Sequence, residues 1–286
     1  MSGIEQWLVD HKIPVGSWGE SFFDFLIENF AGFFDAITDG GSFLIDGSVE
    51  LLLLVPSVIL IVLVTAIAQY LQRSWKLSLF VVLSLLFIIN QGYWEETIES
   101  LVLVVYATMV CMFAGVPLGI AAAHRPWLYS ILRPVLDLLQ TIPTFVYLIP
   151  AMTLFGLGMV PALVATVIFA IAAPVRLTHL GVSSVPKPLV EAAESFGATK
   201  KQLLWKVEIP YALPTIMAGV TQCIMLSLSM VVIGALVGAS GLGKPVVRAL
   251  NSRQIDMGIE AGLAIVIVAI LLDRLCKQRN APVDGA

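Results

Sequence analysis

Long apolar runs alternate along the chain with short polar stretches, a pattern typical of a protein that crosses a membrane several times. A helix needs about 20 mostly apolar residues to cross the hydrocarbon core of a bilayer. Seven segments meet this requirement, at about 50–71, 77–94, 98–123, 134–156, 159–180, 212–238 and 257–275. The pattern therefore predicts an all-α membrane protein with about seven transmembrane helices.

The fourth and fifth predicted spans each contain proline within an apolar run. Pro143 and Pro150 interrupt the fourth span, and Pro174 lies in the fifth. A proline in a spanning helix frees a backbone carbonyl, which must find a partner in a neighbouring helix or a wet cavity. Each proline is compatible with an ordinary packing kink, and the two helices are also our candidates for lining a transport pathway.

The first 49 residues are acidic and contain no apolar run long enough to span a membrane. Ser17 and Glu20 have the spacing of a capping box at the start of a helix. One face of the helix that follows is apolar: Trp18, Phe22, Phe25, Leu26, Phe30, Phe33 and Ile37. Acids mostly occupy the other face, so we predict an external tail, 1–49, with an amphipathic helix. This helix either lies in the outer interface of the membrane or packs against the protein's own outer surface.

Composition excludes a soluble protein. Hydrophobic residues make up 58% of the chain, charged residues 13%, and the mean hydropathy is +0.94. A soluble domain carries roughly a quarter charged residues, which it needs to cover its surface. The net charge of −4 gives no support to nucleic-acid binding. The acidic start shows no cleavable signal peptide, and the scattered cysteines are expected to be small buried hydrophobes.

The basic residues predict the orientation, because cytoplasmic loops carry the excess of Lys and Arg. With the C-terminus inside, the inner segments hold twelve of the 16 basic residues: Arg73, Lys76, Arg125, Arg133, Arg176, Lys187, Lys200, Lys201, Lys206, Arg274, Lys277 and Arg279. The outer segments keep only Lys12, Lys244, Arg248 and Arg253. We therefore predict the N-terminus outside and the C-terminal tail, 276–286, in the cytoplasm.

The longest inner loop, residues 181–211, combines charges with apolar side chains. The apolar residues are Leu189, Val190, Phe196, Leu203, Leu204 and Trp205. A solvated linker has no need for them, whereas an apolar surface beside charges is typical of a site for a partner. The length and composition of the loop predict a short helical hairpin on the cytoplasmic face.

A pattern within this loop resembles the signature of ABC importer permeases, which is EAA, three residues, Gly, nine residues and Ile-x-Leu-Pro. Here the pattern runs from Glu191 through Gly197 to Pro210, with Val207 in place of Ile and Ile209 in place of Leu. In that family the loop forms a coupling helix that is seated in a cytoplasmic ATPase subunit. The resemblance implies these ATPase-coupling residues: Glu191, Ala192, Ala193, Gly197 and Pro210.

A second resemblance covers nearly the whole chain and is to the glycine betaine/proline betaine permeases, which have a related branch for choline. The matching stretches are 136–150, 176–178, 195–198, 214–220, 225–233 and 271–275. The resemblance implies a type I ABC importer permease fold and a permease subunit for quaternary amines in the bacterial plasma (inner) membrane. It also implies a homodimer, an external substrate-binding protein, and ATPase subunits that bind ATP and Mg²⁺, so that this chain needs no cofactor. Import of choline or carnitine by the same machinery is the alternative.

The fourth span and the last outer loop hold further candidate residues. The translocation-path candidates are Thr141, Pro143, Phe145, Tyr147 and Pro150. Residues 238–245 fit the phosphate-binding pattern GxxxxGK, but a proline stands where Ser or Thr would hold Mg²⁺, so we predict a flexible outer turn. In the resembling family this region is near the docking face of the binding protein, and a solvated loop is the alternative. The docking candidates are Lys244, Arg248 and Arg253.

The remaining polar residues favour neither catalysis nor ion coupling. The three histidines form no cluster with catalytic or metal-ligand spacing. Charges within the spans are scarce and lie near the span ends, which argues against a secondary transporter. We expect Asp137 to pair with Arg133, one helical turn earlier. GxxxG spacing indicates close helix packing at Gly115/Gly119, Gly234/Gly238 and Gly258/Gly262.

The sequence thus predicts a non-enzymatic transport subunit in three parts. These are the external tail 1–49, a transmembrane permease domain 50–275 that includes the cytoplasmic coupling loop 181–211, and the cytoplasmic tail 276–286.

Overall fold

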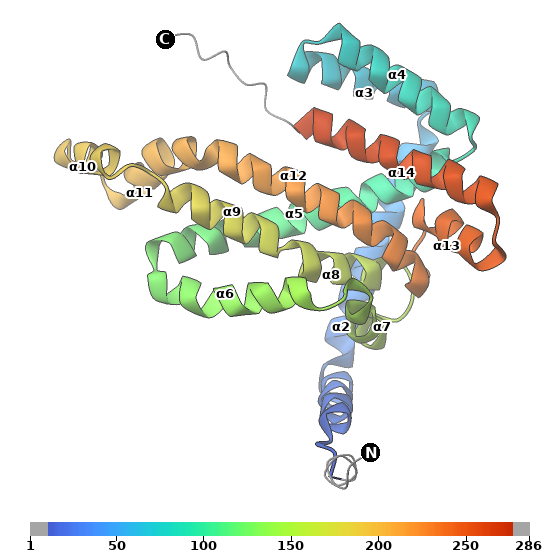
Figure 1. The fold of residues 1–286 in the computed structure, drawn as a ribbon, viewed down its shortest axis with the longest axis horizontal. Helices are drawn as coiled ribbons and strands as arrows, with labels where there is room; N and C mark the ends of the chain where they lie inside the picture. Colours follow the sequence, from blue (N-terminus) through green and yellow to red (C-terminus); the bar gives the residue numbers. More distant parts are fainter. Residues whose placement is uncertain (1–10, 277–286) are drawn as a thin grey trace, which may run out of the picture.

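The computed structural model describes residues 11–276, and within that range the chain is helical and contains no strand. Four helical stretches are long and apolar enough to cross a membrane without a sharp bend: Trp94–His124, Met159–Ser183, Lys200–Val237 and Ile255–Cys276. Figure 1 shows α10 (Lys187–Ser195) and α11 (Lys200–Leu203) at one end of the bundle, with α13 (Gly243–Ser252) at the other. The prediction of an all-α membrane protein is confirmed.

Two of the predicted spans are sharply bent or broken in the structure. The segment 50–71 is divided by Pro56 between α2 (Val15–Leu54) and α3 (Ser57–Gln72), which meet at 101°. The segment 134–156 is divided at Pro143 between α6 (Pro126–Thr141) and the pair η1 (Thr144–Tyr147) and α7 (Leu148–Phe155), with a bend of 104°. Proline lacks the N–H that would continue the helix, which explains both breaks.

The predicted span 77–94 is α4 (Trp75–Asn90), which has 16 residues. At 1.5 Å per residue it is about 24 Å long, shorter than a hydrocarbon core of about 30 Å. By length and composition, the described residues therefore hold four spans, or up to six if each bent pair is one span. The other predicted spans match α5 (Trp94–His124), α8 with α9 (Met159–Ala170, Ala172–Ser183), α12 (Ile209–Gly234) and α14 (Ile255–Cys276).

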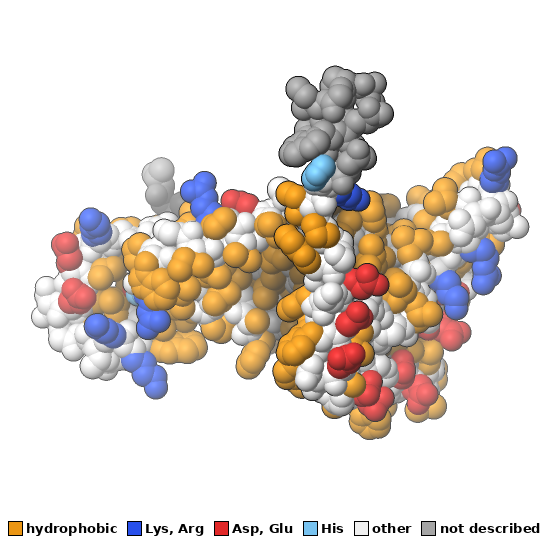
Figure 2. All heavy atoms as spheres, turned by 90° about the horizontal axis from the view of Figure 1, so that it is seen from below, with side chains coloured by type: hydrophobic (Ala, Val, Ile, Leu, Met, Phe, Trp, Pro, Cys, Tyr) orange, Lys and Arg blue, Asp and Glu red, His pale blue; other side chains and the backbone are white. Residues whose placement is uncertain are grey.

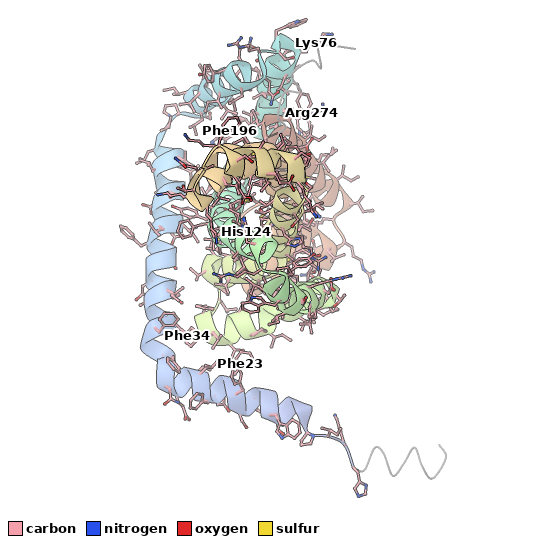
Figure 3. The ribbon with its side chains drawn as sticks, turned by 90° about the vertical axis from the view of Figure 1, so that its left-hand side faces the viewer. Phe23, Phe34, Lys76, His124, Phe196 and Arg274 are labelled. Carbon is pink, nitrogen blue, oxygen red and sulfur yellow. The ribbon has the colours of Figure 1, made fainter. Side chains whose placement is uncertain are left out.

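Helix α2 crosses the predicted boundary between tail and membrane domain without interruption. It begins at Val15, and the expected capping box is not formed, because the Ser17 hydroxyl donates to the Pro14 carbonyl instead. Its second half packs on the bundle, where the Ser48 and Tyr106 hydroxyls are 2.8 Å apart. Figure 3, which looks along the bundle, shows this half lying across the spans.

The first half of α2, which we call the arm (residues 15–29), departs from the second half at a kink in Phe30. Trp18, Phe22 and Phe25 are each more than half exposed on it. Figure 2 shows hydrophobic side chains on one side of the arm and a row of acidic side chains on the other. The arm is therefore amphipathic, as predicted, and its apolar side is not covered by the described part of the chain.

The centre of the bundle is a seam where α5, α9 and α12 approach one another closely at glycines. A Cβ atom on Gly119 would lie 2.7 Å from the Val175 carbonyl oxygen, and one on Gly115 would lie 3.0 Å from the Pro174 ring. Gly219 of α12 faces Pro174 and Leu177 of α9 in the same way. The predicted packing at Gly115/Gly119 is confirmed. Small residues here allow dispersion contacts between backbones, which is how membrane helices associate.

A second hydrophobic core joins α3, α4 and α14 to the first half of α5. Val81, Ile88, Leu103 and Val268 are almost fully buried in it. Cys111 and Cys223 are fully buried between α5 and α12, as expected of small hydrophobes.

Candidate functional site

Residues 187–208, which we call the coupling segment, form the predicted helical hairpin. Helix α10 ends in a Schellman motif, in which the Ala198 N–H donates to the Ala193 carbonyl and the Gly197 N–H to the Glu194 carbonyl. Gly197 has φ +76°, a left-handed conformation that glycine adopts without a steric penalty. The Thr199 side chain then caps α11, and Gln202 completes a capping box. A left-handed turn at Gly197 therefore joins the two short helices of the hairpin.

The coupling segment exposes three of its large apolar residues, whereas Leu203 is buried. Phe196 is 92% exposed, Trp205 61% and Leu189 47%, and α10 has no buried residue. Among the expected coupling residues, Glu191, Ala192 and Pro210 are exposed and Ala193 is half-buried. A surface of this kind at the end of a bundle is suited to a protein partner.

The coupling segment is attached to the bundle through a contact that the sequence did not predict. It ends in a short π-helix, η2 (Leu204–Glu208), that leads into α12. Glu208 is buried, and its Oε2 lies 2.9 Å from Nε2 of His124, the last residue of α5. The other ring nitrogen of His124, Nδ1, lies 3.0 Å from the Ile120 carbonyl oxygen. No pattern in the sequence pairs residues 84 positions apart.

In the broken fourth span, a side chain supplies the hydrogen-bond donor that Pro143 lacks. Pro143 cannot donate to the carbonyl of Leu139, four residues earlier, and the Tyr147 hydroxyl donates to that carbonyl at 2.6 Å. Tyr147 is therefore buried, whereas Phe145 is 59% exposed. The five path candidates thus do not share one surface: Thr141 and Pro143 are exposed like Phe145, and Pro150 is half-buried in α7.

An ion pair between α6 and α9 replaces one that we expected within α6. Asp137 accepts a hydrogen bond from Arg176 at 2.7 Å, so the expected pairing with Arg133 is wrong. The Tyr129 and His179 rings also stack between these helices, with centroids 3.6 Å apart. Both contacts join α6 to α9.

The segment 238–245 is packed and not the flexible turn that we expected. The Leu242 N–H donates to the Ser100 hydroxyl at 2.8 Å, and Leu242 is fully buried. Gly243 already begins α13, and the Val231 carbonyl occupies the space where its side chain would stand. Ser100 of α5 thus holds this segment in place. The docking candidates Lys244, Arg248 and Arg253 are all exposed at this end of the bundle.

The described residues contain no group of three or more His, Cys, Asp or Glu side chains that could hold a metal ion. The described part of the chain combines three features that a transport protein needs. They are a close-packed seam of spans, a span broken at a proline, and a segment with exposed apolar residues at one end.

Comparisons with known proteins identify the class. Residues 115–275 match the family model for the binding-protein-dependent transport system inner membrane component. The chain belongs to this family and is a multi-pass membrane transport protein.

Named relatives place it more closely. It is 44% identical over 93% of its length to the glycine betaine transport system permease protein OpuAB of Bacillus subtilis, of which it covers 94%. It is 46% identical over 94% of its length to the glycine betaine/carnitine transport permease protein GbuB of Listeria monocytogenes, covering 96% of it. With the glycine betaine/proline betaine transport system permease protein ProW of Escherichia coli it shares 41% identity over 93% of this chain and 76% of the relative.

A solved structure confirms the fold. A chain of the MetNI methionine ABC transporter, described in inward-facing conformations, superposes with a TM-score of 0.54 at 22% identity. The match covers 65% of this chain and 92% of that chain. The expected type I ABC importer permease fold is therefore confirmed.

Proposed function

We propose that this chain is the pore-forming permease subunit of an ATP-driven importer of glycine betaine and related quaternary amines. The observation that carries the proposal is near full-length similarity to three permeases whose names all include glycine betaine. The packed spans and the exposed coupling segment are the parts that such a subunit needs. One relative's name includes carnitine, which supports carnitine as an alternative substrate, and that of another, OpuCD of Bacillus subtilis, also includes choline.

The proposed assembly is a homodimer of this chain with cytoplasmic ATPase subunits and an external substrate-binding protein. The ATPase binds ATP and Mg²⁺, and this chain neither hydrolyses ATP nor holds a cofactor. The exposed Phe196, Leu189 and Trp205 support a partner at the coupling segment. Lys244, Arg248 and Arg253 are exposed at the opposite end, which supports their proposed contact with the binding protein.

The proposed orientation in the bacterial plasma membrane is N-terminus outside and C-terminus inside. Basic residues from different helices gather at one end of the bundle, which supports a cytoplasmic location for that end. Lys76 lies in the first turn of α4 and Arg274 in the last turn of α14. In Figure 1 these two helix ends point toward the side of the bundle that carries α10 and α11. The arm, with acids on one side and aromatic residues on the other, then lies flat in the outer interface of the membrane.

The path proposal rests on the broken fourth span. Phe145 and Thr141 are exposed on this span near Pro143. The buried Tyr147 instead donates a hydrogen bond to the Leu139 carbonyl. The spans carry no buried charge to hold an amine, since Glu208 at the cytoplasmic end is the one buried charged residue among those described. We therefore assign substrate choice to the binding protein, where aromatic side chains can bind a quaternary ammonium group by cation–π attraction.

The test is uptake by the complete transporter in proteoliposomes. The chain is purified with its ATPase and supplied with its binding protein, and radiolabelled glycine betaine uptake is measured with and without ATP. We expect uptake that requires both ATP and the binding protein. Uptake driven by an ion gradient without ATP would contradict the proposal and favour a secondary transporter. Replacing the binding protein by one from a choline system that docks should redirect uptake to choline.

A further inference from the structure

Glu208 is the one acidic or basic side chain that is buried among the described residues, with 7% of its surface exposed. Burying a carboxylate costs on the order of several kcal/mol unless a partner replaces the hydrogen bonds that it loses to water. Its partner is His124, at 2.9 Å. A residue type that is expensive to bury has therefore been placed at the junction between the coupling segment and α12.

The hydrogen bonds of His124 define what this contact is. The Ile120 carbonyl can only accept, so Nδ1 of His124 carries a proton. Nε2 and the Glu208 carboxylate then share one further proton between them, as an ion pair or as a neutral pair. In either form the contact is a hydrogen bond with a titratable group on each side, and such bonds are among the stronger ones in proteins.

The Glu208–His124 pair lies where the chain changes from a π-helix to the α-helix α12. A π-helix is a wide turn inserted in an α-helix and is frequent at functional sites. Here η2 is the last part of the coupling segment, directly before α12, and Glu208 is its last residue. His124 is the last residue of α5, and α5 is held against α9 through Gly115 and Gly119.

We propose that the Glu208–His124 contact is a positioning contact that makes α5 follow the coupling segment when an ATPase moves it. Without the contact, movement of α10 and α11 reaches the bundle through the chain connections to α9 on one side and to α12 on the other. With it, the same movement also acts directly on α5, which ends at His124. The inference rests on the proposed function, because it concerns how that coupling segment acts.

The test measures coupling and not activity alone. Glu208→Gln, His124→Gln and the double variant are reconstituted with ATPase and binding protein, and the betaine imported per ATP hydrolysed is determined. We expect each single variant to lower this ratio by about tenfold, a size typical of coupling between sites. The double variant should be no worse than either single one, because both remove the same contact. The exchange His124→Glu/Glu208→His should restore most of the ratio.

The matched control is Asp137→Asn, which breaks the more exposed pair with Arg176 that joins α6 to α9. This variant should keep the wild-type ratio. The inference is overturned if the Glu208 and His124 variants keep the ratio while assembled complex or total ATP hydrolysis falls, or if their losses add in the double variant. A wild-type complex without ATP-dependent uptake contradicts the proposed function, whereas normal wild-type uptake with unaffected variants contradicts only this inference.

Discussion

Two regions of the molecule are rich in apolar residues: the seam of α5, α9 and α12, and the coupling segment. They differ in how closely these residues are packed against the rest of the chain. In the seam, the Val175 carbonyl leaves no room for a Cβ atom at Gly119. In the coupling segment, a Cβ on Gly197 would meet nothing within 4 Å, and the neighbouring Phe196 is 92% exposed. The seam is closely packed within the chain, whereas the coupling segment leaves a large apolar side chain exposed.

The difference teaches that hydrophobic content alone does not locate the functional surface. The seam contains small residues, which allow the helix backbones to pack closely. The coupling segment uses large side chains in a polar setting, where water leaves them available to another protein. Substitutions in the seam should therefore damage the fold, and substitutions in the coupling segment should damage transport.

The largest effect is expected for Gly119→Leu in the seam. The new side chain must displace the Val175 carbonyl and the Thr178 side chain, both 2.7 Å from the Cβ position. Overpacking of this kind should lower the free energy of unfolding by about 3 kcal/mol. The measurement is thermal unfolding of the purified permease in detergent. Gly262→Leu is the control, since nothing lies within 4 Å of its Cβ position, and equal stability of the two variants would contradict the comparison.

Gly197→Asp should separate transport from folding. The aspartate must adopt a left-handed conformation, at a cost of about 1–2 kcal/mol for a non-glycine residue, and it adds charge to the partner-facing turn. We expect betaine uptake to fall about tenfold while the amount of protein in the membrane stays the same. Gly197→Asn, which tolerates this conformation better, should keep more uptake. Normal uptake and normal co-purification of the ATPase with the aspartate variant would refute the coupling role.

The smallest of these effects is expected for Tyr147→Phe. Removal of the hydroxyl leaves the Leu139 carbonyl, freed by Pro143, without its 2.6 Å partner. An unsatisfied buried acceptor should cost about 1–2 kcal/mol of stability, again measured by thermal unfolding. Tyr70→Phe is the control, because Tyr70 is 81% exposed. If both variants unfold alike, Tyr147 does not support the break.

Much of the fold was predictable because a bilayer requires long apolar helices. The spans at 98–123, 159–180, 212–238 and 257–275 were recognisable from length and composition, and the coupling loop from its signature. The broken spans were not, since proline in a spanning helix is compatible with either a kink or a break. The sequence placed Pro56 inside a span, whereas the structure ends α2 just before it and turns by 101°.

The pairing of charges was less predictable than the helices. Asp137 has Arg133 one turn away in sequence, yet it pairs with Arg176 of a different helix. His124 and Glu208 meet only because α5 and the coupling segment end at the same place. Local spacing can suggest pairs within one helix, but contacts between helices depend on packing that a single sequence does not contain.

The most direct test of the account is the accessibility of a cysteine at position 196, in a Phe196→Cys variant whose native cysteines are replaced. A membrane-impermeant maleimide is applied to right-side-out and inside-out vesicles, with and without the ATPase subunit. The account predicts labelling only in inside-out vesicles and strong protection when the ATPase is bound. A cysteine at the exposed Leu250 of α13 should show the reverse sidedness and no protection. Labelling of position 196 from the outside, or labelling that the ATPase leaves unchanged, would contradict the account.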